Sequence, residues 1–166
     1  MTRIYFEKYD SEKDFSDYYK LLSNKEVMDM NYGRPFTMEE AKMVFNKLLK
    51  INKKHEKFGY FKIFEIDKKK LIGLAGIIIK ENSIEADVQY LLFPEYWDKG
   101  YGTEVLEELL NIARKDKNIK NVIGITDPNN IASRKILLKR GFLSEKVYEI
   151  EDGSLAEKFI NTLEFK

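Results

Sequence analysis

The stretch Pro94-Glu-Tyr-Trp-Asp-Lys-Gly100-Tyr-Gly102-Thr-Glu104 follows an apolar, strand-like segment and leads directly into a helical pattern. Two glycines one residue apart let the main chain turn sharply, and the helix that follows starts with N–H groups that have no carbonyl partner. These donors, with the positive end of the helix dipole behind them, favour a polyanion. The stretch therefore predicts a phosphate cradle; the alternative is an ordinary turn between a strand and a helix.

Two familiar nucleotide-binding motifs do not match this turn. The position three residues after Gly102 is Val105, and no acidic residue ends a suitable second strand, so the dinucleotide fingerprint is absent. No Gly-Lys-Ser/Thr follows, which excludes a Walker A loop. A short pyrophosphate cradle is what remains.

The composition indicates one ordered globular domain, which we expect to span residues 1–166. Of the 166 residues, 43% are apolar and only three are proline. The 29 basic and 28 acidic residues nearly cancel, so no global charge favours nucleic acid or a membrane surface. The absence of cysteine and the single histidine argue against thiolate and multi-histidine metal sites, and we expect no metal.

The N-terminal segment has no apolar core typical of a secretory signal. No apolar run approaches the roughly 20 residues that span a bilayer. We therefore expect a cytoplasmic protein.

The first third of the chain predicts one strand and two helices. Residues 3–7 suit a strand, and Ser11 with Asp14 resembles a helix start. Thr37 with Glu40 is a capping box that opens the second helix. Residues 30–36 are then expected to form a loop.

The rest of the chain predicts a mixed sheet with helices packed on it, an α/β (α+β) fold. Three strands are expected at residues 58–66, 71–79 and 84–93, as an antiparallel meander. Later elements are a helix with its apolar stripe at 105–113, a strand at 122–126, a helix at 131–140 closed by Gly141, and strands at 142–150 and 155–165 around Asp152-Gly153. If the strands at 84–93 and 122–126 are parallel, the glycine turn lies at their carboxyl ends, where such sheets bind ligands.

Two motifs together resemble the GNAT acetyltransferases: Tyr90-Leu-Leu-Phe-Pro-Glu-Tyr-Trp-Asp-Lys-Gly-Tyr-Gly-Thr-Glu and Asn130-Ile-Ala-Ser-Arg-Lys-Ile-Leu-Leu-Lys-Arg-Gly-Phe. The match is closest to the RimJ/RimL type, which acetylates protein N-termini and other amines, and covers about residues 85–142. The resemblance implies a mostly antiparallel sheet with helices on both faces and splayed central parallel strands. It also implies acetyl-CoA as donor and a primary amine as acceptor, with direct attack in a ternary complex.

The resemblance also assigns the coenzyme site. The family motif Gln/Arg-x-x-Gly-x-Gly/Ala matches Trp97 to Gly102, where Trp97 departs from the first position. The residues implied to hold acetyl-CoA are Leu91, Leu92, Phe93, Asp98, Lys99, Gly100, Tyr101, Gly102, Thr103, Asn130 and Ser133. Core packing is the alternative for the strand residues, and helix capping is the alternative for Asn130.

The attacking amine must be neutral, so that its nitrogen has a free lone pair. Lysine-like amines have a pKa near 10.4 and α-amino groups near 8, so they are largely protonated near neutral pH and must lose a proton. A main-chain N–H at Leu92 is the candidate oxyanion donor. Many GNAT enzymes have a tyrosine acid where this chain has Leu137, so Ser133 is our candidate acid for the leaving thiolate; it is alternatively a helix-start serine. Asp87 is a candidate base that relays a proton through water, or else a solvated strand residue. His55, in a charge-rich segment, is expected to be exposed.

Two competing functions remain open from the sequence. The missing tyrosine is compatible with a catalytically weak acyl-CoA-binding regulatory module, and the glycine turn with nucleotide binding. The acceptor is not readable, because residues 30–36 and the final hairpin, which we expect to shape its pocket, carry no recognisable motif. The assembly is expected to be a monomer or a homodimer.

Overall fold

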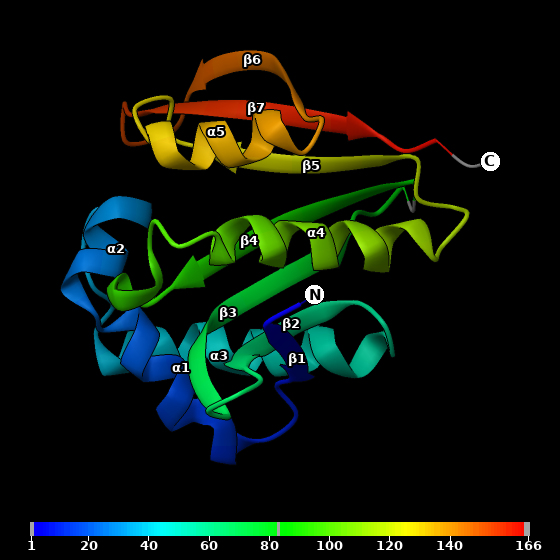
Figure 1. The fold of residues 1–166 in the computed structure, drawn as a ribbon. Helices are drawn as coiled ribbons and strands as arrows, with labels where there is room; N and C mark the ends of the chain where they lie inside the picture. Colours follow the sequence, from blue (N-terminus) through cyan, green and yellow to red (C-terminus); the bar gives the residue numbers. More distant parts are fainter. Residues whose placement is uncertain (1, 83, 165–166) are drawn as a thin grey trace.

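The computed structural model describes residues 2–82 and 84–164, which form one seven-stranded sheet with helices on both faces (Figure 1). The strands are β1 (Ile4–Lys8), β2 (Gly59–Glu65), β3 (Lys70–Ile79), β4 (Glu85–Leu92), β5 (Asn121–Thr126), β6 (Leu143–Glu149) and β7 (Leu155–Thr162). Their order in the sheet is β1-β2-β3-β4-β5-β7-β6. The β4–β5 pair is parallel and the other neighbouring pairs are antiparallel. The predicted mixed, mostly antiparallel sheet is confirmed.

The helices build a separate apolar core on each face. They are η1 (Glu12–Asp14), α1 (Phe15–Leu22), α2 (Lys25–Asn31), α3 (Met38–Lys54), η2 (Pro94–Tyr96), α4 (Tyr101–Arg114) and α5 (Ile131–Lys139), where η marks a short 3-10 helix. The larger buried cluster contains the apolar stripe of α4, including Val105 and Leu109, and Leu137 of α5. The second cluster joins α1, α2 and α3, through residues such as Leu21, Val27 and Phe45. Helices therefore cover both faces of the sheet.

The expectation of a loop at residues 30–36 is wrong at its start, because α2 extends through Asn31. Asn24 caps this helix by accepting the Val27 N–H at 3.1 Å. The helix has seven residues and buries only Val27 and Met28. So short a helix shows too little apolar periodicity to be recognised in the sequence.

The other local signals are confirmed. Thr37 and Glu40 form the reciprocal capping box at the start of α3. Gly141 ends α5 with φ +86°, in the left-handed region that the C′ position favours. The hairpin around Asp152-Gly153 joins β6 to β7. Residue 165, the expected end of the last strand, lies outside the described residues.

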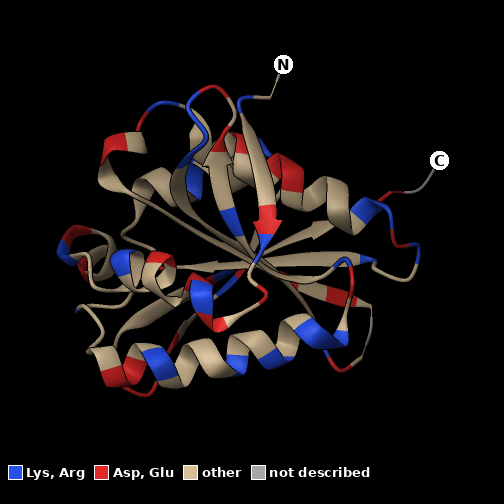
Figure 2. Ribbon diagram, turned by 90° about the horizontal axis from the view of Figure 1, so that it is seen from below, with Lys and Arg blue, Asp and Glu red and all other residues tan. Residues whose placement is uncertain are grey.

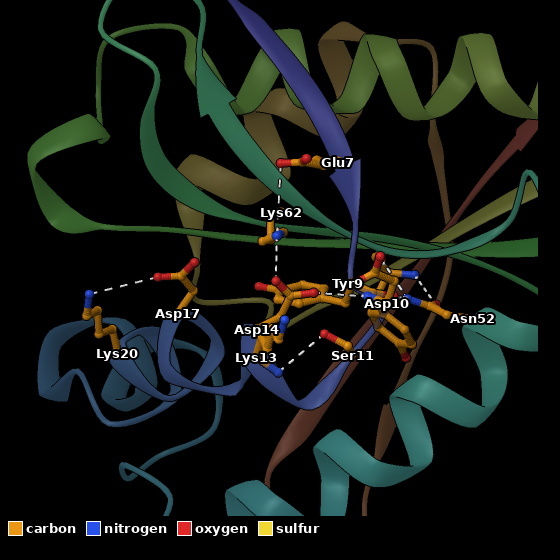
Figure 3. Close-up of polar contacts among 11 residues, drawn as sticks. Glu7, Tyr9, Asp10, Ser11, Lys13, Asp14, Asp17, Lys20, Asn52 and Lys62 are labelled. Carbon is orange, nitrogen blue, oxygen red and sulfur yellow. Dashed lines mark hydrogen bonds and ion pairs between the residues drawn. The ribbon is translucent and has the colours of Figure 1, made fainter.

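Buried polar contacts attach the N-terminal helices to the sheet (Figure 3). Lys62 of β2 donates to Asp14 at 2.7 Å, and the two side chains are only 11% and 13% exposed. Asn52 of α3 accepts the Tyr60 N–H at 2.8 Å and donates to the Tyr9 carbonyl at 2.8 Å. Buried polar groups are costly unless they are paired, so these contacts hold η1 and α3 in defined positions beside β2.

Charged residues of both signs are intermixed on the helices and loops, whereas the central strands are mostly uncharged (Figure 2). The formal net charge of the chain is +1. Within the described ranges, no helix is both long and apolar enough to cross a membrane.

Candidate active site

The parallel strands β4 and β5 separate at their carboxyl ends (Figure 1). Their pairing runs from Glu85 with Asn121 to Val88 with Gly124. Beyond this point β4 stays paired with β3 as far as Leu92, while β5 stays paired with β7 as far as Thr126. The splayed central strands expected from the sequence are confirmed, and the last part of β4 turns one main-chain edge towards the divergence.

The main chain of Leu92 points towards this divergence. The N–H of the next residue, Phe93, donates to Ile72 of β3 at 3.0 Å. Because successive residues of a strand direct their N–H groups to opposite sides, the Leu92 N–H faces away from β3. The Leu92 carbonyl accepts the Trp97 indole N–H at 2.8 Å. Trp97, which departs from the family motif, therefore secures the end of β4 through its side chain.

Gly73 of β3 allows the end of β4 to approach closely. It lies opposite Leu92 in the register. A Cβ atom at Gly73 would lie 2.1 Å from the carbonyl oxygen of Leu91. No side chain fits between the two strands at this point, so the position of Leu92 depends on this glycine.

The turn that follows has the geometry of an anion cradle. Asp98 and Gly100 have φ values of +58° and +85°, both in the left-handed region. Such residues in a tight turn form a concave nest of N–H groups. Within the described chain, no side chain caps the N-terminus of α4, whose first main-chain bond runs from Glu104 N–H to Gly100 O at 3.2 Å. The N–H groups of Tyr101, Gly102 and Thr103 precede this bond and have no acceptor within the helix.

The two glycines of the turn have different structural roles. Gly100 is required by its left-handed backbone, and a Cβ there would lie 3.3 Å from the guanidinium of Arg3. Gly102 is buried, and a Cβ there would lie 3.0 Å from Ile136 of α5 and 3.3 Å from the ring of Tyr90. Gly102 thus lets α4 pack closely against both β4 and α5.

Asn130 and Ser133 lie at the start of α5. The Asn130 side-chain oxygen accepts the Ser133 N–H at 3.1 Å, so Asn130 is the N-cap of this helix. Its side-chain nitrogen takes no part in this bond. The Ser133 side chain is half-buried and borders Tyr90.

Tyr90 is a site residue that the sequence reasoning did not single out. Its hydroxyl lies 3.4 Å from the position of a Cβ on Gly102, between the cradle and α5. Burial raises the pKa of Tyr90 to about 12, although a side-chain hydrogen bond with Ser133 acts in the opposite direction. Tyr90 is thus protonated near neutral pH, and its hydroxyl lies beside Ser133. In the sequence, an aromatic residue in an apolar strand indicates only core packing.

Asp87 lies apart from this group, in the paired part of β4 opposite Ile123. The nearest cation is Lys80, 3.8 Å from its Oδ1. This oxygen is buried, and it has no hydrogen-bond partner among the described residues. Burial raises the pKa of Asp87, with the attraction of Lys80 opposing the change. His55 is exposed, as expected, at the end of α3.

Comparison with known proteins identifies the family. The model of the acetyltransferase (GNAT) domain matches residues 3–143. The chain belongs to the GNAT family. It is 26% identical over 137 residues to the uncharacterized N-acetyltransferase YnaD of Bacillus subtilis. The aligned region covers 82% of this chain and 78% of YnaD.

Solved GNAT structures share the fold over nearly the whole chain. RimL, a ribosomal L7/L12 alpha-N-protein acetyltransferase in complex with coenzyme A, has a TM-score of 0.81 and 14% identity, covering 98% of this chain and 96% of RimL. The aminoglycoside acetyltransferase AAC(6')-Ib, in complex with coenzyme A, has a TM-score of 0.79 and 16% identity. The superposition covers 96% of this chain and 94% of AAC(6')-Ib. One fold thus serves proteins named for very different acceptors.

As a GNAT domain, this protein is an acetyl-CoA-dependent N-acetyltransferase. The position where many family members have a tyrosine holds Leu137, which is only 4% exposed. A Cβ on Gly124 would lie 2.9 Å from the Leu137 side chain. In place of the tyrosine, Leu137 packs against Gly124, where the pairing of β5 with β4 ends.

Proposed function

We propose that residues 1–166 form a single GNAT domain of the RimJ/RimL type, which transfers acetyl from acetyl-CoA to a primary amine by direct attack in a ternary complex. The observation that carries this proposal is the divergence of β4 and β5 beside the uncapped start of α4. An extended pantetheine arm fits the exposed edge of β4, and a diphosphate fits the helix start. Both binding elements are main-chain groups, so the departure at Trp97 does not remove them.

The coenzyme contacts follow from this arrangement. The turn from Asp98 to Thr103 binds the pyrophosphate through its N–H groups. The main chain of Leu91, Leu92 and Phe93 runs beside the pantetheine arm. Asn130 contributes its side-chain nitrogen to the same arm.

In the reaction, the neutral amine attacks the thioester carbon and gives a tetrahedral oxyanion. The Leu92 N–H, directed away from β3, donates to this oxyanion. The carbon–sulfur bond then breaks, and the amide and the CoA thiolate separate. Ser133 protonates or hydrogen-bonds the sulfur, and Tyr90 lies beside Ser133.

Asp87 accepts the amine proton through water. Its raised pKa favours proton uptake, and its buried oxygen lacks a competing hydrogen bond within the described chain. Asp87 lies in the paired part of β4, before the divergence, so it acts on the amine without direct contact. A water relay fits this separation.

The acceptor is a protein N-terminus or a small amine. An acceptor screen tests the proposal: acetyl-CoA is incubated with N-terminal peptides, polyamines and aminoglycosides, and free thiol is measured. We expect thiol release above background with at least one class of amine, at a rate that rises with pH as the amine loses its proton. Binding of acetyl-CoA without release for any amine would contradict the proposed transfer. Size-exclusion chromatography distinguishes a monomer from the homodimer.

A further inference from the structure

Arg3, just before the edge strand β1, lies against the start of α4. Its Nη2 donates to the Lys99 carbonyl at 3.0 Å, and its main-chain N–H donates to Glu104 Oε1 at 2.9 Å. Its Nε donates to the second oxygen of the same carboxylate. The guanidinium carbon lies 3.9 Å from the centroid of the Tyr101 ring. The Arg3 side chain, distant in the sequence, thus contacts two residues of the cradle, Lys99 and Tyr101, and the neighbouring Glu104.

The contact with Lys99 determines which way the turn presents its donors. In a trans peptide, the C=O and the next N–H point in opposite directions. The bond from Arg3 to the Lys99 oxygen therefore directs the Gly100 N–H away from Arg3. Since the missing side chain of Gly100 also faces Arg3, at 3.3 Å, Arg3 covers one side of the turn and the N–H faces the other.

The contact with Glu104 compensates an unfavourable charge. Glu104 is the acidic residue in the first turn of α4. A carboxylate there repels a diphosphate that binds to the same helix start. Arg3 forms an ion pair with this carboxylate and also binds it through its main chain. The Glu104 charge beside the positive helix end is therefore compensated by Arg3.

The base of this arrangement is itself held in place. The Tyr101 hydroxyl donates to Glu65 Oε1 of β2 at 2.9 Å, and the ring packs edge-on against Tyr96. The ring under Arg3 is therefore fixed by two contacts. A planar guanidinium over a fixed aromatic ring is a favourable cation–π geometry.

We propose that Arg3 is a positioning residue for the diphosphate of the coenzyme: it orients the Lys99–Gly100 peptide and neutralises Glu104, so that the turn is formed before the ligand binds. This inference rests on the proposed function, because it presupposes that the cradle binds CoA. It predicts that Arg3 affects affinity for ligands with a diphosphate and leaves affinity for the pantetheine arm unchanged.

The test is calorimetric binding of CoA and of pantetheine, which lacks the diphosphate, to the wild type and to Arg3→Gln. CoA binding to the wild type is measured first, and its failure would contradict the proposed function itself. With binding established, we expect Arg3→Gln to weaken CoA about tenfold and pantetheine less than about twofold. Unchanged CoA affinity, or equal weakening of both ligands, would overturn the role of Arg3.

Two further variants complete the test. Arg114→Gln is the matched control, since Arg114 pairs with Glu107 at 3.1 Å at the other end of α4 and is 43% exposed, compared with 45% for Arg3. It should leave both affinities unchanged. If Arg3→Gln does not fold, Arg3→Lys keeps the charge but lacks the planar fork, so about threefold weaker binding of CoA alone is expected. Wild-type affinity in Arg3→Lys would then overturn the proposal.

Discussion

Gly73→Ala tests whether the position of β4 depends on one glycine. Gly73 is buried in β3, and its φ lies outside the left-handed region. Backbone preference alone therefore predicts that alanine stabilises the fold, by about 0.5–1 kcal/mol. The added Cβ would lie 2.1 Å from the main-chain oxygen of Leu91 and 2.9 Å from the Leu92 side chain. A strand carbonyl cannot rotate away, so the two strands must separate.

The expected cost combines two effects. Overpacking a filled site costs about 1–3 kcal/mol. Separation of the strands also weakens bonds such as that from Phe93 N–H to Ile72 O, which measures 3.0 Å, at about 1 kcal/mol each. We expect Gly73→Ala to lower the free energy of unfolding by about 3 kcal/mol. Displacement of the Leu92 N–H by about 1 Å should also lower kcat/KM about 100-fold.

Urea unfolding, followed by the fluorescence of the single tryptophan, measures the stability change. Gly33→Ala is the control, because Gly33 has φ +100° and a Cβ there would meet no described atom within 4 Å. Only backbone strain of about 1 kcal/mol is expected for this control. A Gly73→Ala protein no less stable than Gly33→Ala would refute the steric reasoning.

Three other perturbations test the cradle, the acid and the buried ion pair. Gly100→Val places a branched residue at φ +85°, at a cost of about 2 kcal/mol that should weaken CoA binding; unchanged affinity in a folded variant contradicts the cradle assignment. Ser133→Ala should lower kcat about 100-fold, more than it weakens CoA binding, and Tyr90→Phe should lower kcat less; normal turnover of Ser133→Ala removes it as the required acid. Burial raises the pKa of Asp14, but its hydrogen bonds, chiefly from Lys62, hold it below the ordinary value. The stabilisation of the fold by the ionised Asp14 carboxylate is therefore present above about pH 4, and it is lost as the pH falls through the lower pKa of Asp14 in the folded state. Asp14→Asn should cost about 2–3 kcal/mol at pH 7 and show a flatter loss of urea stability below pH 4; a wild-type pH profile in this variant contradicts the reasoning.

Local sequence signals were sufficient for most of the fold. The Thr37 capping box, the strand-like runs at 58–66, 71–79 and 84–93 and the Gly141 helix end each act over a few residues, so the pattern predicts the element directly. The helix α2 was missed because seven residues with two buried side chains leave no periodic signal. The glycine turn and the Asn130–Ser133 motif likewise pointed to the donor through a family resemblance, which the match over residues 3–143 supports.

The sequence by itself determined the order of the elements other than α2, the location of the turn and the family, because these depend on local periodicity and short motifs. Only the tertiary structure decided which glycines serve packing and which serve a turn: Gly73 and Gly102 face other strands or helices, whereas Gly100 has a left-handed backbone. It also placed Arg3 beside Glu104, and Tyr90 beside Ser133. These contacts join residues that are distant in the chain, so no local pattern encodes them. Their geometry exists only once the sheet has brought its strands together.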